Sequence, residues 1–264
     1  MMIDLRHVSA QHSITTRKCR FCMLPEPWRI ALQTSNFVVL MGLGPIVIGY
    51  CIIITKKHYA SYAELPDRHL PEFLELVETV QETQRKVFGA SVLFEHGRNG
   101  GCMPYGRDDK LCYHAHMHLL PTNANLAGAV SADYSLEVLP SWTHLSRTAQ
   151  RNSYLLVQDG HYLNCTVNPQ ALPARYLRTK VAEQVLADAT LADWQAFPSY
   201  DLIREGKEAL APELVLAWQS KQEMPLSGLR ELRTPHSIRQ QERFPHRTGA
   251  GSLRRSHKEG HRGD

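Results

Sequence analysis

Three histidines at alternating positions constrain this chain more than any other feature. His114, His116 and His118 stand at every second position. In a β-strand, successive side chains point to opposite faces, so residues two apart share one face, whereas in a helix the same positions would spread around the axis. Residues 113–121 therefore predict a strand with a row of imidazoles on one face. Three titratable rings side by side add little to fold stability, so the pattern favours a chemical use. The opposite face of the strand would carry apolar side chains: Ala115, Met117 and Leu119.

The composition is that of a globular protein with a separate basic tail. The chain has 264 residues, of which 43% are hydrophobic and 21% are charged, enough for one large domain with a sizeable core. The net charge of +4 comes from the end of the chain, because residues 225–264 carry nine Lys and Arg against four Asp and Glu. We expect residues 221–264 to form a disordered basic tail, because few apolar side chains lie there. Contact of this tail with nucleic acid phosphates is the weaker alternative.

A long uncharged stretch between Phe37 and Ile54 predicts two buried strands. The stretch reaches the length at which a membrane span must be considered. Residues that favour turns interrupt it, namely Gly42, Gly44, Pro45 and Gly49. Apolar residues typical of strands gather on either side, at residues 37–41 and 51–54, so a hairpin explains the stretch better. We therefore expect no membrane-spanning segment.

Shorter patterns predict the remaining elements. Apolar residues recur at three- and four-residue steps between Asp67 and Phe88, which indicates an amphipathic helix that stops at Gly89. The other expected elements are a strand at 92–96, a hairpin formed by 153–157 and 161–167, and a helix over 175–189. Four regions are expected along the chain: a polar leader at 1–18, a catalytic domain at 19–125, an extension packed on it at 126–220, and the tail at 221–264.

Two of the six cysteines have the spacing of a metal site. Cys19 and Cys22 form a C-x-x-C pair, which can supply half of a tetrahedral zinc site and needs two further ligands. Pro25 and Pro27 argue against the helix that a redox C-x-x-C would begin, and two unrelated thiols remain an alternative. The first 18 residues contain no apolar secretory segment, so we expect a cytoplasmic protein with reduced thiols.

These motifs resemble the histidine triad (HIT) superfamily. Its signature is His-x-His-x-His followed by apolar residues, which corresponds here to His114, His116 and His118 with residues 119–121. The preceding order of hairpin, helix, strand and loop agrees, and the resemblance covers roughly residues 19 to 121. It implies an α+β fold in which helices flank a central antiparallel sheet, often in a homodimer.

The resemblance also implies a reaction and a metal. It describes a nucleotide hydrolase or nucleotidyltransferase in which His116 attacks the α-phosphate of a nucleotide or dinucleotide and forms a covalent intermediate. His118 would contact the phosphate, and His114 would support the reacting histidine from its other side. Imidazole is a good nucleophile near neutral pH. Zinc-bearing members of the family imply a structural Zn²⁺ bound by Cys19, Cys22, His58 and His114.

The chain departs from the family at the substrate contacts. The family usually has Gly-His where this chain has Gly49 and Tyr50, and it often has an Asp or Asn for the ribose that is missing from residues 40–42. Residues 108–112 also lack the family's usual leaving-group contact. Four residues are candidate substitutes in substrate binding, against the alternative that they are solvated loop or strand-end residues: Glu95, His96, Asn99 and Lys110.

Two other functions remain open from the sequence. In the first, His114, His116 and His118 all bind a catalytic metal that activates water in a metal-dependent hydrolase. In the second, the HIT unit is a non-catalytic scaffold that binds nucleotides or, through its basic tail, nucleic acid.

Overall fold

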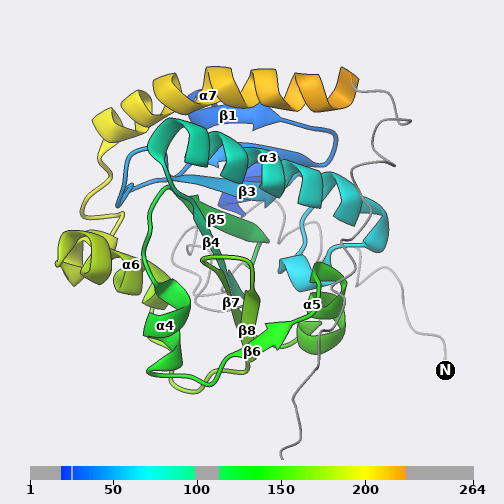
Figure 1. The fold of residues 1–264 in the computed structure, drawn as a ribbon, viewed down its shortest axis with the longest axis vertical. Helices are drawn as coiled ribbons and strands as arrows, with labels where there is room; N and C mark the ends of the chain where they lie inside the picture. The colour runs from blue at the N-terminus through cyan, green and yellow to red at the C-terminus, as the bar shows by residue number, and fades with distance from the viewer. Residues whose placement is uncertain (1–18, 25, 99–112, 224–264) are drawn as a thin grey trace, which may run out of the picture. The chain divides into compact units, whose positions relative to one another are not determined.

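The computed structural model describes residues 19–24, 26–98 and 113–223 (Figure 1). The expected leader at 1–18 lies outside the described residues, as do the candidate substrate contacts Asn99 and Lys110. The expected tail also lies outside them, except that residues 221–223 still belong to the last helix.

One antiparallel sheet organises the described residues. Its strand order is β1-β2-β3-β5-β4-β7-β8-β6, and every pair of neighbouring strands is antiparallel. This architecture, with helices against the sheet, confirms the predicted α+β class. The strands are β1 (Ile30–Gln33), β2 (Phe37–Met41), β3 (Cys51–Thr55), β4 (Val92–Gly97), β5 (His116–Leu120), β6 (Glu137–Leu139), β7 (Tyr154–Gln158) and β8 (Leu163–Val167).

Helices pack on both faces of this sheet. The α-helices are α2 (Arg20–Met23), α3 (Leu70–Phe88), α4 (Leu126–Ser131), α5 (Trp142–Ala149), α6 (Tyr176–Leu186) and α7 (Tyr200–Glu223). The short 3₁₀ helices are η1 (Pro27–Arg29), η2 (Tyr62–Glu64), η3 (Asp67–His69) and η4 (Ala189–Ala192). α3 and α7 run side by side in Figure 1.

The uncharged stretch forms the expected hairpin. β2 and β3 pair in register from Phe37 with Thr55 to Met41 with Cys51, and all ten residues are buried. A strand that is buried on both faces has an unbroken run of apolar residues in its sequence. This explains why the uncharged stretch resembles a membrane span. Among the described residues, no helix combines the length and the apolar character that crossing a membrane would require.

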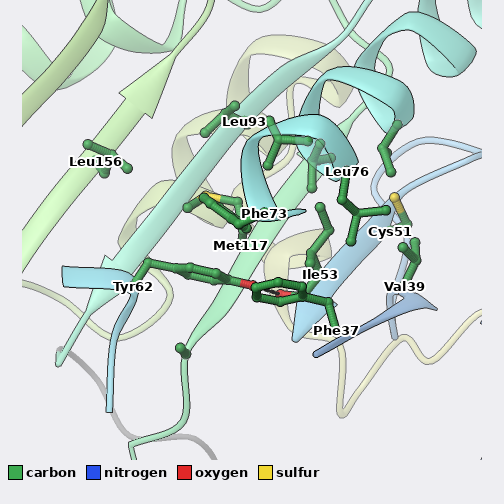
Figure 2. Close-up of a cluster of buried hydrophobic side chains, with 14 of the residues drawn as sticks. Phe37, Val39, Cys51, Ile53, Tyr62, Phe73, Leu76, Leu93, Met117 and Leu156 are labelled. Carbon is green, nitrogen blue, oxygen red and sulfur yellow. Dashed lines mark hydrogen bonds between the residues drawn. The ribbon is translucent and has the colours of Figure 1, made fainter. Parts of the chain in front are cut away.

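One face of the sheet, which we call the α3 face, packs against α3, α5 and α7. Phe73 and Leu76 of α3 contact a cluster that includes Ile53 of β3 and Met117 of β5 (Figure 2). The helix begins three residues later than predicted, because residues 67–69 form η3. It ends where expected, at Gly89, whose φ of 88° lies in the left-handed region that glycine adopts readily.

The opposite face, which we call the histidine face, packs against α4 and α6. Its cluster includes Phe94, Leu155 and, from α6, Leu177 and Val181. Met117 and Leu119 belong to the α3 face, so the alternation along residues 113–121 confirms the predicted separation of apolar and histidine faces. Strands β6 to β8 continue the same sheet, and the domain boundary at residue 125 stays a prediction.

Candidate functional site

The three histidines do not stand in equivalent places. β5 begins at His116, so His114 lies two residues before the strand. His118 pairs with Ile52 on one side and with Phe94 on the other. His114 is 1% exposed and His118 is 8% exposed, while His116 is half-buried. The strand therefore positions two imidazoles on one face, and the third belongs to a neighbouring cluster.

That cluster contains the four predicted zinc ligands. The donor atoms of Cys19, Cys22, His58 and His114 all lie within 4.8 Å of one another. Nδ1 of His114 is 3.3 Å from Sγ of Cys19 and 3.5 Å from Sγ of Cys22, and Nδ1 of His58 is 3.2 Å from Sγ of Cys22. Sulfur and nitrogen ligands of a tetrahedral Zn²⁺ lie about 3.5 Å apart. Two thiolates and two imidazoles make a closed set, so the cluster fits a structural zinc.

The hydrogen bonds of His114 agree with this use. Its Nε2 lies 2.8 Å from the carbonyl oxygen of Thr55 and 3.1 Å from the Thr55 hydroxyl. A carbonyl only accepts, so Nε2 carries the proton and Nδ1 has the lone pair that a metal needs. Such a bond from the outer nitrogen is the usual support of a metal-binding histidine.

His114 also orients His116. The backbone carbonyl of His114 accepts a hydrogen bond from Nδ1 of His116 at 2.7 Å, which puts the lone pair of the His116 ring on Nε2. Burial lowers the pKa of His116. Phe21, between the two cysteines, packs its ring 5.2 Å from that of His116 and 5.6 Å from that of His114. The C-x-x-C segment thus covers the start of the histidine row. It forms the single-turn helix α2, although Pro25 and Pro27 argued against a helix there; both prolines follow the end of this short helix.

His118 is held by two aromatic residues. The hydroxyl of Tyr50 lies 2.6 Å from its Nδ1, and the ring of Phe94 stacks on it at 4.5 Å. Burial, followed by the nearby His116, lowers the pKa of His118 well below its usual range. In the sequence Tyr50 was only a departure from the family pattern, and the structure places it in contact with the histidine row.

A buried arginine lies on the same face. Arg178 of α6 donates from Nε to the carbonyl of Ala192 at 3.0 Å and from Nη2 to the carbonyl of Gly44 at 2.7 Å. Its guanidinium carbon is 5.4 Å from the centre of the Tyr50 ring. The sequence did not identify Arg178 as a site residue, because an arginine in a helix usually indicates a solvated face.

The two remaining described candidates for substrate contact lie on opposite faces. His96 is on the histidine face, where its Nε2 accepts a hydrogen bond from the backbone N–H of Leu177 at 3.0 Å. Burial lowers the pKa of His96 to about 3. Glu95 is on the α3 face, where it accepts hydrogen bonds from the N–H of Tyr62 at 3.0 Å and from the Tyr154 hydroxyl. The structure therefore brings His96, but not Glu95, to the side of His116 and His118.

Comparisons with known proteins agree with the histidine motif. No family model matches the chain. The chain is 24% identical over 108 residues to an uncharacterized HIT-like protein of Methanocaldococcus jannaschii, covering 39% of this chain and 78% of that one. It is 22% identical over 110 residues to an uncharacterized HIT-like protein of Saccharolobus solfataricus, covering 39% and 73%.

Among solved structures, a Zn-bound histidine triad family protein of Mycobacterium smegmatis is 15% identical, with a TM-score of 0.32. The match covers 50% of this chain and 90% of that one. The curated relatives confirm the resemblance to the HIT superfamily, over less than half of this chain.

Proposed function

We propose that this chain, which resembles the HIT proteins, is a nucleotide hydrolase or nucleotidyltransferase that attacks an α-phosphate through His116. One observation carries the proposal. The 2.7 Å bond from Nδ1 of His116 to the His114 carbonyl fixes the ring and presents Nε2 as the reacting nitrogen. A nucleophile oriented by a neighbouring acceptor is the arrangement that covalent catalysis requires.

The reaction has two displacements at phosphorus. In the first, Nε2 of His116 forms a bond to the α-phosphorus while the bond to the leaving oxygen breaks, and that oxygen takes the electron pair. In the second, water or another phosphate attacks the same phosphorus, the P–N bond breaks, and the electron pair returns to Nε2; an attacking water releases its extra proton to the solvent. Dividing one difficult displacement into two easier steps lowers the barrier.

His118 and the cysteine-histidine cluster support these steps. His118 lies beside His116, with 4.9 Å between ring centres, so it can stabilise negative charge that grows on the phosphate oxygens. Cys19, Cys22, His58 and His114 would hold a structural zinc, which adds rigidity to the backbone around His114. The carbonyl on which His116 depends is then held in place, and the metal takes no part in the chemical steps.

The same geometry favours this reaction over a metal-dependent hydrolase that uses all three histidines. Nδ1 of His114 faces the two cysteines, and Nδ1 of His116 is bound to a carbonyl. The imidazole rings of His114 and His116 therefore bind different partners, and their nitrogens do not converge on one ion.

A trapping experiment tests the proposal. The full chain is incubated with dinucleotides labelled at the α-phosphate and then denatured. Label should remain on the wild-type protein and be absent from His116→Ala. The control is His161→Ala, which removes an exposed histidine at a turn and should leave labelling unchanged. Labelling that survives in His116→Ala contradicts the mechanism, whereas nucleotide binding with no label at all supports the non-catalytic scaffold.

A further inference from the structure

Two buried arginines differ in how their charge is balanced. Arg29 is 3% exposed and Arg178 is 6% exposed. Arg29 forms an ion pair with Glu26 at 2.8 Å. Arg178 donates to two backbone carbonyls, and no carboxylate in the described part of the chain lies within ion-pair distance of it. A buried charge is costly unless an opposite charge accompanies it, so Arg178 lacks the partner that Arg29 has.

The carboxylate of Asp193 is close enough to Arg178 to interact with it electrostatically, but it forms its ion pair with Arg175, at 3.2 Å. The aromatic side chains around Arg178 are neutral. Burial raises the pKa of Tyr50, so its hydroxyl stays protonated near neutral pH. The pKa values of His96 and His118 are lowered, mainly by burial, so both rings stay neutral. The guanidinium therefore faces neutral groups on the face that carries His118.

The N-terminal end of α6 adds partial positive charge next to the Arg178 guanidinium. Its first turn has no side-chain cap, and its Leu177 N–H points to the ring of His96. The N-terminal end of a helix carries partial positive charge and favours anions. Arg178 stands in the same turn, so a full charge and the helix end lie together beside the histidine row.

We propose that Arg178 balances the negative charge of the nucleotide phosphate bound at His116 and His118, so that α6 completes the phosphate site. This inference rests on the proposed function. It assigns a specificity role to a residue outside the part of the chain that carries the HIT motif. The competing account is structural: Arg178 ties the β2–β3 loop, through Gly44, to η4, through Ala192.

Comparing nucleotide with nucleoside separates the two accounts. The full chain is titrated by calorimetry or ligand-observed NMR with the four ribonucleoside 5′-monophosphates and the four nucleosides. Arg178→Met should weaken binding of the preferred monophosphate by about tenfold or more, because charge-assisted hydrogen bonds contribute strongly to binding. Binding of the matching nucleoside should change little. Equal weakening of both ligands, or no weakening, overturns the inference.

The control is Arg175→Met. It removes the same charge three residues earlier, at the cap of α6, where Arg175 pairs with Asp193 at 3.2 Å. It should keep the preference for monophosphate over nucleoside. A loss of preference equal to that of Arg178→Met overturns the inference, because the effect would then follow net charge alone.

Arg178→Lys covers the case in which Arg178→Met does not fold. Lysine keeps the charge but cannot reproduce the fork that reaches two carbonyls. A preserved preference for monophosphate supports the role of charge, and a lost preference overturns it.

The outcomes also separate this inference from the proposed function. If His116 becomes labelled equally in wild type and Arg178→Met, with the same phosphate preference, only the role of Arg178 fails. If wild-type protein neither binds a nucleotide nor becomes labelled, both fail.

Discussion

Glu95 and His96 are neighbours on β4, and they show how differently the two faces of the sheet treat buried polar groups. On the α3 face, Glu95 accepts hydrogen bonds from Tyr62 and Tyr154 inside an apolar cluster. On the histidine face, His96 lies near His118 and Arg178, where a buried positive charge meets neutral rings. Burial of polar groups therefore does not by itself mark a site. Both neighbours receive hydrogen bonds from the protein, and the difference is that the histidine face also carries an arginine, Arg178, whose described hydrogen bonds go to neutral carbonyls.

The largest expected effect comes from removing a candidate zinc ligand, which should abolish the reactivity of His116. Cys22→Ser should lower the zinc content from about one per chain to about a tenth or less, because a structural site needs all four ligands. Labelling of His116 should fall about 100-fold, since the His114 carbonyl loses its support. Metal analysis and the trapping assay measure both.

The control for this variant is Cys165→Ser, on the α3 face. It should lower stability and leave the zinc content unchanged. Full labelling by a zinc-free Cys22→Ser protein contradicts the dependence of His116 on the cluster.

The second expected effect is a pH dependence of stability that comes from Glu95 on the α3 face. Burial raises the pKa of Glu95 to about 7 in the folded protein, against an ordinary value of 4.5. Between these values the folded protein keeps a proton that the unfolded chain releases, so this contribution to stability is complete below 4.5 and is lost as pH rises through 7. The stability advantage of wild type over Glu95→Gln should therefore shrink by up to about 3 kcal/mol from pH 4.5 to 8.

Chemical denaturation at several pH values measures that difference. His96 and His118 have lowered pKa values and act in the opposite direction, with stability lost as pH falls. Both are present in wild type and in Glu95→Gln, so their effects cancel in the comparison. A difference that does not vary with pH shows that Glu95 stays ionised in the folded protein.

The third effect tests whether the α3 face is purely structural. Tyr154→Phe removes the hydroxyl that donates to Glu95 and accepts from the Ala63 N–H. It should cost about 2 kcal/mol of unfolding free energy, because buried polar groups lose their partner. The labelling rate per folded molecule should stay the same. Tyr162→Phe, at a residue 69% exposed, is the matched control and should change neither quantity.

Short-range patterns predicted much of the fold. The alternation of residues 113–121 assigned the faces of β5, the turn residues after Met41 indicated the β2–β3 hairpin, and three- and four-residue steps indicated α3. The same rule of alternation could have separated Glu95 from His96, because neighbouring residues of a strand point to opposite faces. Treating both as substrate contacts overlooked this.

Other features depend on information that short-range patterns do not contain. α7 was not predicted, and it contains Pro212, although proline usually ends a helix. The tail was expected from residue 221 on the basis of its composition, but residues 221–223 belong to α7. Tyr50 meets His118 across 68 residues of sequence, and Arg178 reaches the same face because α6 packs there. The four candidate zinc ligands were predicted through the family resemblance, because spacing alone identifies only the C-x-x-C pair.

The smallest expected effect concerns Tyr50, the residue in which the histidine face departs from the family. Tyr50→Phe removes the 2.6 Å contact with Nδ1 of His118 and leaves that nitrogen buried without the hydroxyl. We expect the labelling rate to fall about tenfold, corresponding to about 1.4 kcal/mol of activation free energy. Tyr50→His restores a polar partner, the one that the family carries at this position, and should recover part of the rate. If Tyr50→Phe labels as fast as wild type, Tyr50 only fills space, and the histidine face resembles the α3 face more closely than we propose.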